Sequence, residues 1–319
     1  MSLHDWITNT HSRLREEGMT GVTESVYALY RGSWRIVGSR LPLGANIFDH
    51  DWDVLVILDA CRVDLLANVA ADADYIEDVE TSVSVGSTSR EWLAKTFSPA
   101  YREIVRETAY VTANPYTEEI FSSEGGDTRS PFNPANWPTV APNDFLVLEE
   151  VWKDGWDDDR GTVLPRDVTD RAIAVGRTHG PPRMIIHYMQ PHQPFLSENG
   201  KLLFPEFVGD YWGALRRGDL PFTDIWGVYE QTLRLVLDDV ELLRENMDAQ
   251  TVILTADHGN AFGEWGIMGH PNGCLHPSVK TVPWAETTAR DRGTYEPTVD
   301  RSEPTSSIED QLQNLGYVT

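Results

Sequence analysis

The residues TVILTADHGNAFGEWGIMGHP, which run from Thr251 to Pro271, carry the clearest structural signal in the chain. They begin with an apolar, β-branched run without polar alternation, which is typical of a strand buried on both faces. They continue as a polar loop interrupted by glycines, with Asp257 and His258 directly after the strand and His270 later in the loop. Ligands of open parallel sheets bind beyond the carboxyl ends of the strands, so this stretch indicates a binding site at such an edge.

The rest of the chain alternates apolar strands with amphipathic helices. A second unbroken apolar run, DVLVIL, predicts a strand over 53–58 that ends at Asp59. Further strands are predicted over 109–113, 184–188 and 251–255, with helices over 63–69, 166–177 and 225–247 and another that begins near Arg90. Strands that alternate with helices predict an α/β fold with a mostly parallel sheet.

Three regions are expected along the 319 residues. Residues 1–45 carry apolar side chains at helical spacing and are expected to form a helical N-terminal extension that packs on the core; contact with a membrane surface or a partner is the alternative. Residues 46–285 are expected to form the core, and residues 286–319 a tail that packs on it. The stretch 120–162 is rich in proline and aromatic residues and is expected to form a lid or insertion.

The composition is strongly acidic. There are 50 acidic against 26 basic residues, which gives a net charge of −24. Such a field repels phosphate backbones and anionic lipids, so the composition argues against nucleic acid and anionic membranes as partners. The acids are scattered rather than gathered in a tail, which favours a halophilic protein from a high-salt cytoplasm, with an ordinary acidic enzyme as the alternative.

The cysteine content and the hydropathy of the chain indicate the cellular compartment in which the protein is expected. The two cysteines, Cys61 and Cys274, provide neither a disulfide framework nor a thiolate zinc site. The N-terminal residues lack the apolar core of a secretory signal, and no window of about 18 apolar residues predicts a transmembrane segment. The expected location is the cytoplasm, with peripheral attachment to a membrane through a partner as the alternative. The oligomeric state stays open.

Polar side chains gather where three predicted strands end. Asp59 follows the strand 53–58, His187 and His192 lie at and after the strand 184–188, and Asp257 and His258 follow the strand 251–255. Two carboxylates and an imidazole that converge on one point are ligands for a divalent metal. Taken alone, Asp59 is equally well explained as a helix N-cap.

The stretch GSTSREW supplies hydroxyl groups in front of a predicted helix. Ser87, Thr88 and Ser89 would meet backbone N–H groups and the positive end of the helix dipole, a setting that also suits a bound phosphate or sulfate. A hydroxyl bound to a metal becomes a nucleophile more readily. Simple N-capping by Ser89 is the competing explanation.

These stretches together resemble the alkaline phosphatase superfamily, and within it the sulfatase-like branch, including its haloarchaeal type. The resemblance is carried by DVLVILDACRVDLL, by IIHYMQPHQPF, by TADHGNAFGEWGIMGHP, by GCLHPSVKTVPW and by the ending LQNLGYVT. It covers about residues 50–285 and the last few. It implies a three-layer α/β/α alkaline-phosphatase-like core with a mostly parallel sheet.

The resemblance also implies roles for individual residues. Asp59, Asp257 and His258 would bind one divalent metal ion (Mn, Zn, Ca or Mg) with Thr88 as fourth ligand. Thr88 would be the nucleophile, because the family's nucleophile stands two residues before a helix-initiating position taken here by Arg90; Ser87 is the fallback. The groups expected to contact the substrate or its leaving oxygen are His192, His270, His187, Arg62 and Ser87.

The chain departs from the branch at several positions. Sulfatases convert a cysteine or serine in a C/S-x-P/A-x-R signature to formylglycine, and no such cysteine stands near Thr88. Ala60 stands where sulfatases usually carry a second aspartate, and Asn260 stands in place of a glutamate. An unmodified hydroxyl is what phosphodiesterases and phospho-group transferases of the superfamily use, so phosphate is favoured over sulfate.

Two functions therefore compete. The first is a metal-dependent hydrolase or transferase that acts on a small-molecule, glycan-linked or lipid-linked phosphate or sulfate ester. The second is a non-catalytic relative that serves as a binding or scaffold protein in cell-surface polysaccharide assembly. A two-metal phosphomonoesterase is disfavoured, because the spare histidines lack the spacing of a second ligand set; they are His4, His11, His50, His179 and His276.

Overall fold

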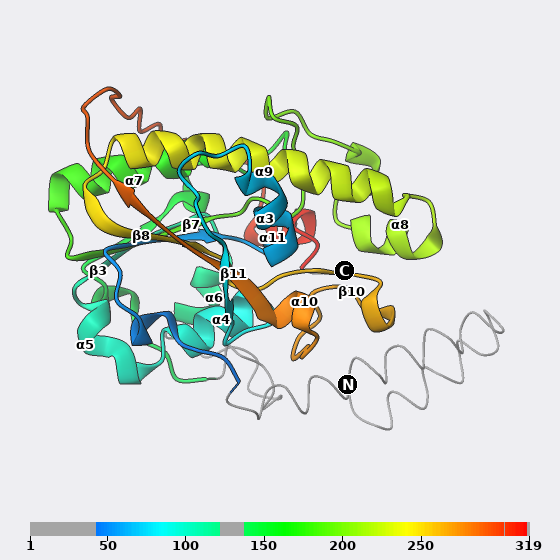
Figure 1. Ribbon diagram of the computed structural model, residues 1–319, viewed down its shortest axis with the longest axis horizontal. Helices are drawn as coiled ribbons and strands as arrows, with labels where there is room; N and C mark the ends of the chain where they lie inside the picture. The colour runs from blue at the N-terminus through cyan, green and yellow to red at the C-terminus, as the bar shows by residue number, and fades with distance from the viewer. Residues whose placement is uncertain (1–42, 122–136, 303, 318–319) are drawn as a thin grey trace.

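The computed structural model describes residues 43–121, 137–302 and 304–317. Almost all of the predicted extension 1–45, and part of the predicted insertion 120–162, lie outside the described residues. Within the described part, the fold is a layered α/β arrangement around one large sheet (Figure 1).

The central sheet has seven strands in the order β2-β11-β8-β1-β7-β3-β4. Five neighbouring strands are parallel, namely β8 (Ala249–Thr255), β1 (Val54–Leu58), β7 (Arg183–Tyr188), β3 (Thr108–Thr112) and β4 (Val147–Glu150). The long strand β11 (Thr281–Ala289) runs antiparallel to β8 and to the edge strand β2 (Glu80–Val83). The prediction of an α/β fold with a mostly parallel sheet is confirmed.

The register of the central strands aligns their carboxyl ends. Leu58, the last residue of β1, pairs with Tyr188, and Ile57 pairs with both His187 and Thr255. Every residue of β1 is buried, which explains why its sequence is apolar without alternation. The residues that directly follow β1, β7 and β8 therefore meet at one edge of the sheet.

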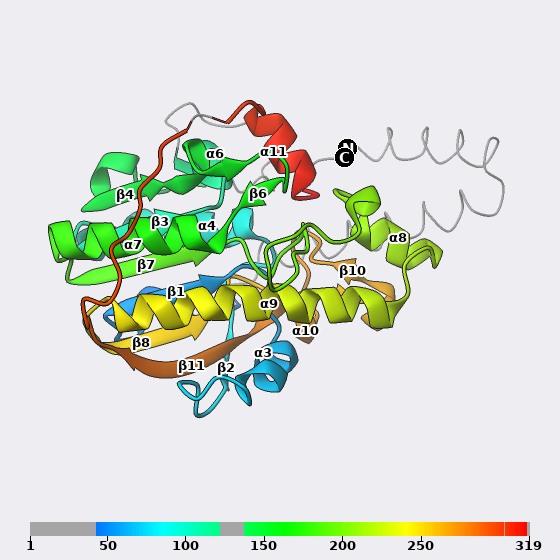
Figure 2. The ribbon, with the colours of Figure 1, turned by 90° about the horizontal axis from the view of Figure 1, so that it is seen from above.

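Helices cover both faces of the sheet. The helices α7 (Pro165–His179) and α9 (Phe222–Glu245) lie side by side on one face, with α3 (Val63–Ala70) nearby (Figure 2). The opposite face carries α4 (Ser89–Thr96), α5 (Arg102–Val105) and α6 (Tyr116–Phe121) (Figure 1). Each interface buries its own apolar cluster, one around Leu65, Ile173 and Val236 and the other around Trp92, Phe97 and Tyr110. The fold thus has three layers, as predicted.

Shorter elements complete the described chain. The strands β9 (Ala261–Phe262) and β10 (Met268–Gly269) form a hairpin near α8 (Tyr211–Arg217), and β5 (Trp156–Asp157) pairs with β6 (Thr162–Val163). The last two helices are α10 (Pro277–Lys280) and α11 (Ile308–Asn314). Single turns of 3₁₀ helix are formed by Ile47–Asp49, Pro99–Tyr101, Pro142–Asp144, Val151–Lys153, Pro205–Phe207 and Glu264–Gly266.

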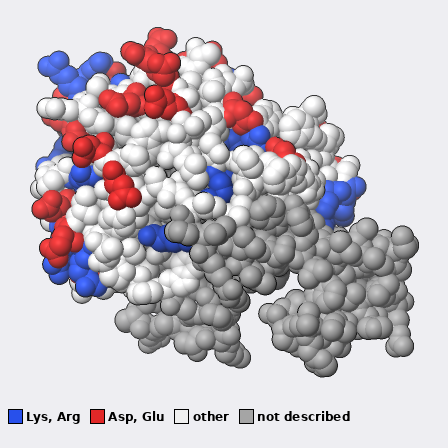
Figure 3. Space-filling view, turned by 60° about the horizontal axis from the view of Figure 1, so that its bottom comes forward, with Lys and Arg blue, Asp and Glu red and all other residues white. Residues whose placement is uncertain are grey.

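Charged side chains are interspersed over the described surface. Acidic and basic groups alternate over the face seen in Figure 3 rather than forming one patch of a single sign. Among the described helices, none combines the length and the apolar character that crossing a bilayer requires.

Candidate active site

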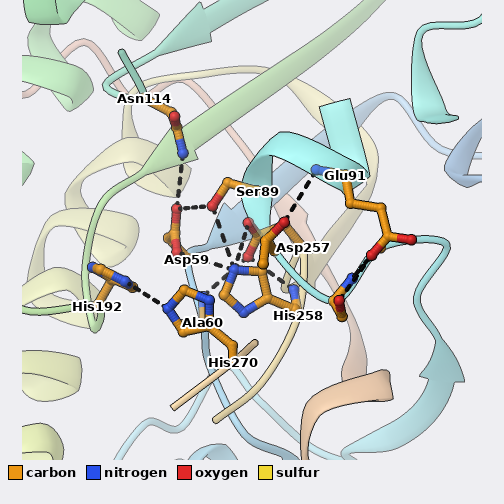
Figure 4. A network of polar contacts seen from close by, with 12 residues as sticks. Asp59, Ala60, Ser89, Glu91, Asn114, His192, Asp257, His258 and His270 are labelled. Carbon is orange, nitrogen blue, oxygen red and sulfur yellow. Dashed lines mark hydrogen bonds and ion pairs between the residues drawn. The ribbon is translucent and has the colours of Figure 1, made fainter. Parts of the chain in front are cut away.

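Three predicted ligands lie together at the carboxyl edge of the sheet. Asp59 directly follows β1, and Asp257 and His258 follow β8 after one intervening residue. Each offers a ligand atom within 4.8 Å of the others, and all three side chains are fully buried (Figure 4). The residues that follow two strands far apart in the sequence therefore lie close together, as the sequence predicted.

The two oxygens of Asp257 have different surroundings. Oδ1 accepts hydrogen bonds from the backbone N–H groups of Ala60, at 3.0 Å, and His258, at 2.9 Å. Its Oδ2, like Oδ1 of Asp59, is buried without a hydrogen-bond partner among the described residues. Burying a carboxylate oxygen without a partner is costly. Two such oxygens beside the imidazole of His258 fit the donor set of a divalent cation.

Ala60 holds this arrangement through its backbone. Its φ of 59° is in the left-handed region, which is unusual for a residue with a side chain. This conformation points its N–H at Asp257, while its carbonyl accepts a hydrogen bond from the hydroxyl of Tyr229. Ala60 thus contributes to the cluster through its main chain.

Asp59 is fixed by polar groups from β7 and from the end of β3. The amide of Asn114 donates to Asp59 Oδ2 at 3.0 Å, and His187 Nε2 lies 3.4 Å from the same oxygen. Burial would raise the pKa of Asp59, but the hydrogen bond with His187 and the charges of His192 and His258 outweigh it and lower the pKa to about 2. Asp59 is therefore ionised at neutral pH.

The hydroxyl that reaches this cluster belongs to Ser89 and not to Thr88. Ser89 Oγ lies 3.1 Å from Asp59 Oδ2 and 3.4 Å from His258 Nε2 (Figure 4). Thr88 is the N-cap of α4: its Oγ1 accepts from the N–H of Glu91 at 3.2 Å and lies 3.2 Å from the side-chain oxygen of Asn272. The hydroxyl next to the three candidate ligands is thus that of Ser89, one residue after the predicted Thr88.

A buried glutamate holds the turn in front of α4. Glu91 Oε2 accepts from the N–H of Ser87 at 2.9 Å and from its hydroxyl at 2.8 Å, which turns that hydroxyl away from the ligand cluster. Burial would raise the pKa of Glu91, but the charge and hydrogen bond of Lys95 and the hydrogen bond from Ser87 lower it. Ser87, the predicted fallback nucleophile and substrate contact, therefore serves the local structure.

Two of the predicted histidines form a pair beside the ligands. The Nε2 atoms of His192 and His270 lie 3.0 Å apart, and the ring of His270 stacks on that of His258 with centroids 4.2 Å apart. Nδ1 of His192 donates to the carbonyl of Gln193 at 2.6 Å. Burial lowers the pKa of His192, and the negative charge of Asp59 offsets part of this effect. The pair can bind or exchange a proton beside Ser89.

Two other predicted substrate contacts lie elsewhere. His187 sits behind Asp59, where Nδ1 is 2.9 Å from the hydroxyl of Tyr110. Arg62 forms ion pairs of 2.6 Å with both Asp64 and Glu264, and its guanidinium lies over the ring of Phe262 in the β9–β10 hairpin. His187 therefore shares Asp59 Oδ2 with Ser89, whereas Arg62 is held at the hairpin.

Sequence reasoning missed two residues of the site. Asn114 follows the predicted strand 109–113, so its place after a strand was an available signal. Tyr317 lies in the LGY ending, and its hydroxyl is 3.1 Å from Ser89 Oγ and 3.4 Å from Asp59 Oδ2. No local pattern identifies Tyr317 as part of the site, because it lies 228 residues from Ser89 and 258 residues from Asp59 along the chain.

Comparisons with known proteins found no matching family model and no matching curated protein. Among solved structures, the C-terminal periplasmic domain of phosphoethanolamine transferase EptC from Campylobacter jejuni is 16% identical, with 74% of this chain and 79% of that chain covered and a TM-score of 0.45. The soluble domain of lipooligosaccharide phosphoethanolamine transferase A from Neisseria meningitidis is 15% identical, with coverages of 75% and 76% and a TM-score of 0.46. Phosphonate monoester hydrolase of Agrobacterium radiobacter is 13% identical, with coverages of 74% and 68% and a TM-score of 0.36.

Proposed function

We propose that this chain is a metal-dependent enzyme that transfers or hydrolyses phosphate esters, as a member of the sulfatase-like branch of the alkaline phosphatase superfamily, with Ser89 as its nucleophile. The observation that carries the proposal is the position of the Ser89 hydroxyl, 3.1 Å from Asp59 and 3.4 Å from His258. A hydroxyl beside two ligands of a cation, at the first residue of a helix, is placed to ionise and attack.

The residues present fit one divalent ion. Asp59, Asp257 and His258 would hold it, with Ser89 as fourth ligand. Two carboxylates with one imidazole suit Mn²⁺ or Zn²⁺ better than Ca²⁺ or Mg²⁺, which prefer all-oxygen sites. When bound, the ion would offset the negative charge that develops on the transferred group.

The chain's own residues account for the proton movements. Ser89 loses its proton to water, and its Oγ forms a bond to phosphorus while the bond from phosphorus to the leaving oxygen breaks. One histidine of the His192–His270 pair, protonated beforehand, gives its proton to that oxygen. In the second half, an acceptor hydroxyl passes its proton to the same histidine, and its oxygen forms a bond to phosphorus while the bond from phosphorus to Ser89 Oγ breaks. Ser89 Oγ then takes back a proton from water. Water as acceptor makes a hydrolase, and a sugar or lipid hydroxyl makes a transferase.

Phosphate is proposed over sulfate because the nucleophile is an unmodified serine. The residues after Ser89 are Arg90, Glu91 and Trp92, which do not form the C/S-x-P/A-x-R signature that formylglycine formation requires. The two cysteines are buried, and neither belongs to the turn before α4.

The proposal is tested by comparing Ser89→Ala with Thr88→Asn. Asparagine can cap α4 as threonine does, so this control removes the Thr88 hydroxyl while the helix start is kept. With Mn²⁺ or Zn²⁺ present, Ser89→Ala should lose hydrolysis of bis-p-nitrophenyl phosphate and the phospho-enzyme seen by intact mass spectrometry, while Thr88→Asn keeps both.

The opposite pattern would move the nucleophile to Thr88. Faster turnover of p-nitrophenyl sulfate than of the phosphodiester would move the substrate class to sulfate. Stoichiometric metal without turnover of either compound would favour the non-catalytic scaffold.

A further inference from the structure

The C-terminal turn of the chain reaches into the proposed active site. After α11, Leu315 is fully buried, and Tyr317 extends from Gly316 to place its hydroxyl 3.1 Å from Ser89 Oγ. The same hydroxyl lies 3.4 Å from Asp59 Oδ2. A residue close to the end of the chain thus contacts both the proposed nucleophile and a proposed metal ligand.

The turn is anchored independently of that hydroxyl. Gln193, next to His192, donates from its side-chain amide to the carbonyl of Leu315 at 2.9 Å. Gly316 has a φ of 72°, which favours glycine, and a Cβ there would lie 1.9 Å from Gln193 Nε2 and displace that amide. The N–H of Tyr317 donates to the carbonyl of Leu312 at 2.9 Å.

The ring of Tyr317 is also held by packing. Its centroid is 4.7 Å from that of Tyr116, on α6, and 4.9 Å from that of His192. These contacts involve the aromatic ring and not the hydroxyl, so replacing tyrosine by phenylalanine should keep the ring in place. The function of the hydroxyl can therefore be separated from that of the ring.

The geometry points to Tyr317 as a further residue of the reaction site, whose hydroxyl positions Ser89 Oγ for attack and donates a hydrogen bond to it as its proton leaves; this inference rests on the proposed function. A serine hydroxyl has three staggered positions, and the two contacts of 3.1 Å, to Asp59 and to Tyr317, favour the one that faces the ligands. Ionised Asp59 can only accept, whereas the phenol can donate to a negatively charged oxygen.

The test compares Tyr317→Phe with Tyr116→Phe in the full chain. Tyr116 belongs to the same aromatic pair, so the control removes a neighbouring hydroxyl and leaves the contacts of Ser89 unchanged. With bis-p-nitrophenyl phosphate and Mn²⁺, Tyr317→Phe should lower kcat about tenfold and change KM less than about twofold, as expected for one hydrogen bond to a charged oxygen. Tyr116→Phe should keep the wild-type kcat.

Two further readouts do not depend on turnover. Affinity for Mn²⁺, measured by isothermal titration calorimetry, should be the same in Tyr317→Phe and wild type. Diisopropyl fluorophosphate should label Ser89, with the Oγ–P bond forming as the P–F bond breaks and HF is released. Peptide mass spectrometry should find this labelling about fivefold slower in Tyr317→Phe.

The possible outcomes separate the two proposals. Wild-type kcat and labelling in Tyr317→Phe, with Ser89→Ala inactive, would overturn the role of Tyr317 and leave the proposed function standing. Loss of Mn²⁺ affinity together with kcat would also overturn it, because Tyr317 would then support the metal site rather than Ser89. If Ser89→Ala hydrolyses bis-p-nitrophenyl phosphate at the wild-type rate, and diisopropyl fluorophosphate does not label Ser89 in wild type, the proposed function is wrong. The proposed role of Tyr317 is then wrong as well.

Discussion

The two carboxylate oxygens of Asp257 have different surroundings: one is bound by backbone groups, and the other faces the centre of the candidate ligand cluster. One oxygen accepts two backbone hydrogen bonds, and the other is buried without a hydrogen-bond partner in the described part of the chain. Asparagine at this position can keep the accepting oxygen toward the N–H groups of Ala60 and His258. It would then turn its NH₂ group toward the cation site, where a donor cannot act as a ligand.

We therefore expect Asp257→Asn to fold but to bind Mn²⁺ or Zn²⁺ at least about 100-fold more weakly, as expected when one charged ligand of a small site is lost. The wild-type melting temperature should fall when a chelator is added, since a ligand at 100 times its Kd stabilises the native state by about 2.7 kcal/mol. Asp257→Asn should not respond to the chelator. Asp78→Asn, at an exposed position, is the matched control and should behave like wild type. A chelator that leaves the wild-type melting temperature unchanged would contradict the assignment.

At the scale of residues, the sequence locates the three candidate ligands better than the candidate nucleophile. Asp59, Asp257 and His258 could be brought together because they lie within three residues of the ends of buried strands, and strand ends meet at one edge. Choosing between Thr88 and Ser89 requires knowing which of two adjacent hydroxyls caps α4, because the cap turns back to the helix while the next residue points outward. A one-residue error there changes the proposed nucleophile.

At the scale of elements, the start of α4 depends on a buried lysine. Lys280, at the end of α10, is 6% exposed and donates to the carbonyl of Gly86 at 3.2 Å, just before the hydroxyl-rich turn. Burial, partly offset by the attraction of Glu91, lowers the pKa of Lys280 from 10.5 to about 8. The charged form of this lysine is therefore less favourable in the folded state than in the unfolded chain.

The lowered pKa of Lys280 predicts the direction in which the stability of the protein changes with pH. Between pH 8 and 10.5 the unfolded chain binds more protons at Lys280 than the folded protein does, so its contribution to the free energy of unfolding rises with pH across that window. In urea unfolding, the free energy of unfolding of wild type should rise by about 2 kcal/mol relative to that of Lys280→Met between pH 8 and 10.5. Lys201→Met, at an exposed position, controls for the loss of a lysine elsewhere. Parallel pH curves for wild type and Lys280→Met would contradict the prediction.

The elements that sequence patterns predicted have either a run buried on both faces or a helical period. All of β1 and the residues VILT of β8 are buried, and the predicted helix 225–247 differs from α9 by a few residues at each end. The edge strands β2, ETSV, and β4, VLEE, mix polar and apolar residues without a fully buried face, so their sequences do not distinguish them from loops. Their strand conformation depends on pairing with β11 and β3, which no local pattern reveals.

At the scale of the whole molecule, the amino-acid composition gives the net charge but not the distribution of the charged side chains over the surface. The net charge of −24 argues against nucleic acid and anionic membranes as partners, whereas the layering follows from the order of strands and helices. The surface itself shows how the charge is distributed: basic groups stand among the acidic ones over the face seen in Figure 3. Local ion pairs such as that of Arg234 with Asp72, at 2.7 Å, relieve part of the repulsion, but the excess of negative charge remains.

That excess predicts a salt dependence of the whole fold. Like charges spread over one surface destabilise the compact state, and salt shortens their range from about 10 Å at 0.1 M to about 3 Å at 1 M. We expect the melting temperature to rise by about 5 °C or more between dilute buffer and molar KCl, which corresponds to about 3 kcal/mol for a chain of this size. KCl is the appropriate salt, because sulfate stabilises most proteins by exclusion from the surface. The exposed acids Glu77, Asp78 and Glu80 offer a control, since replacing them by their amides changes the net charge from −24 to −21 and should reduce the rise. A melting temperature that is equal in dilute buffer and in molar KCl would show that the acidic surface is not an adaptation to a high-salt cytoplasm.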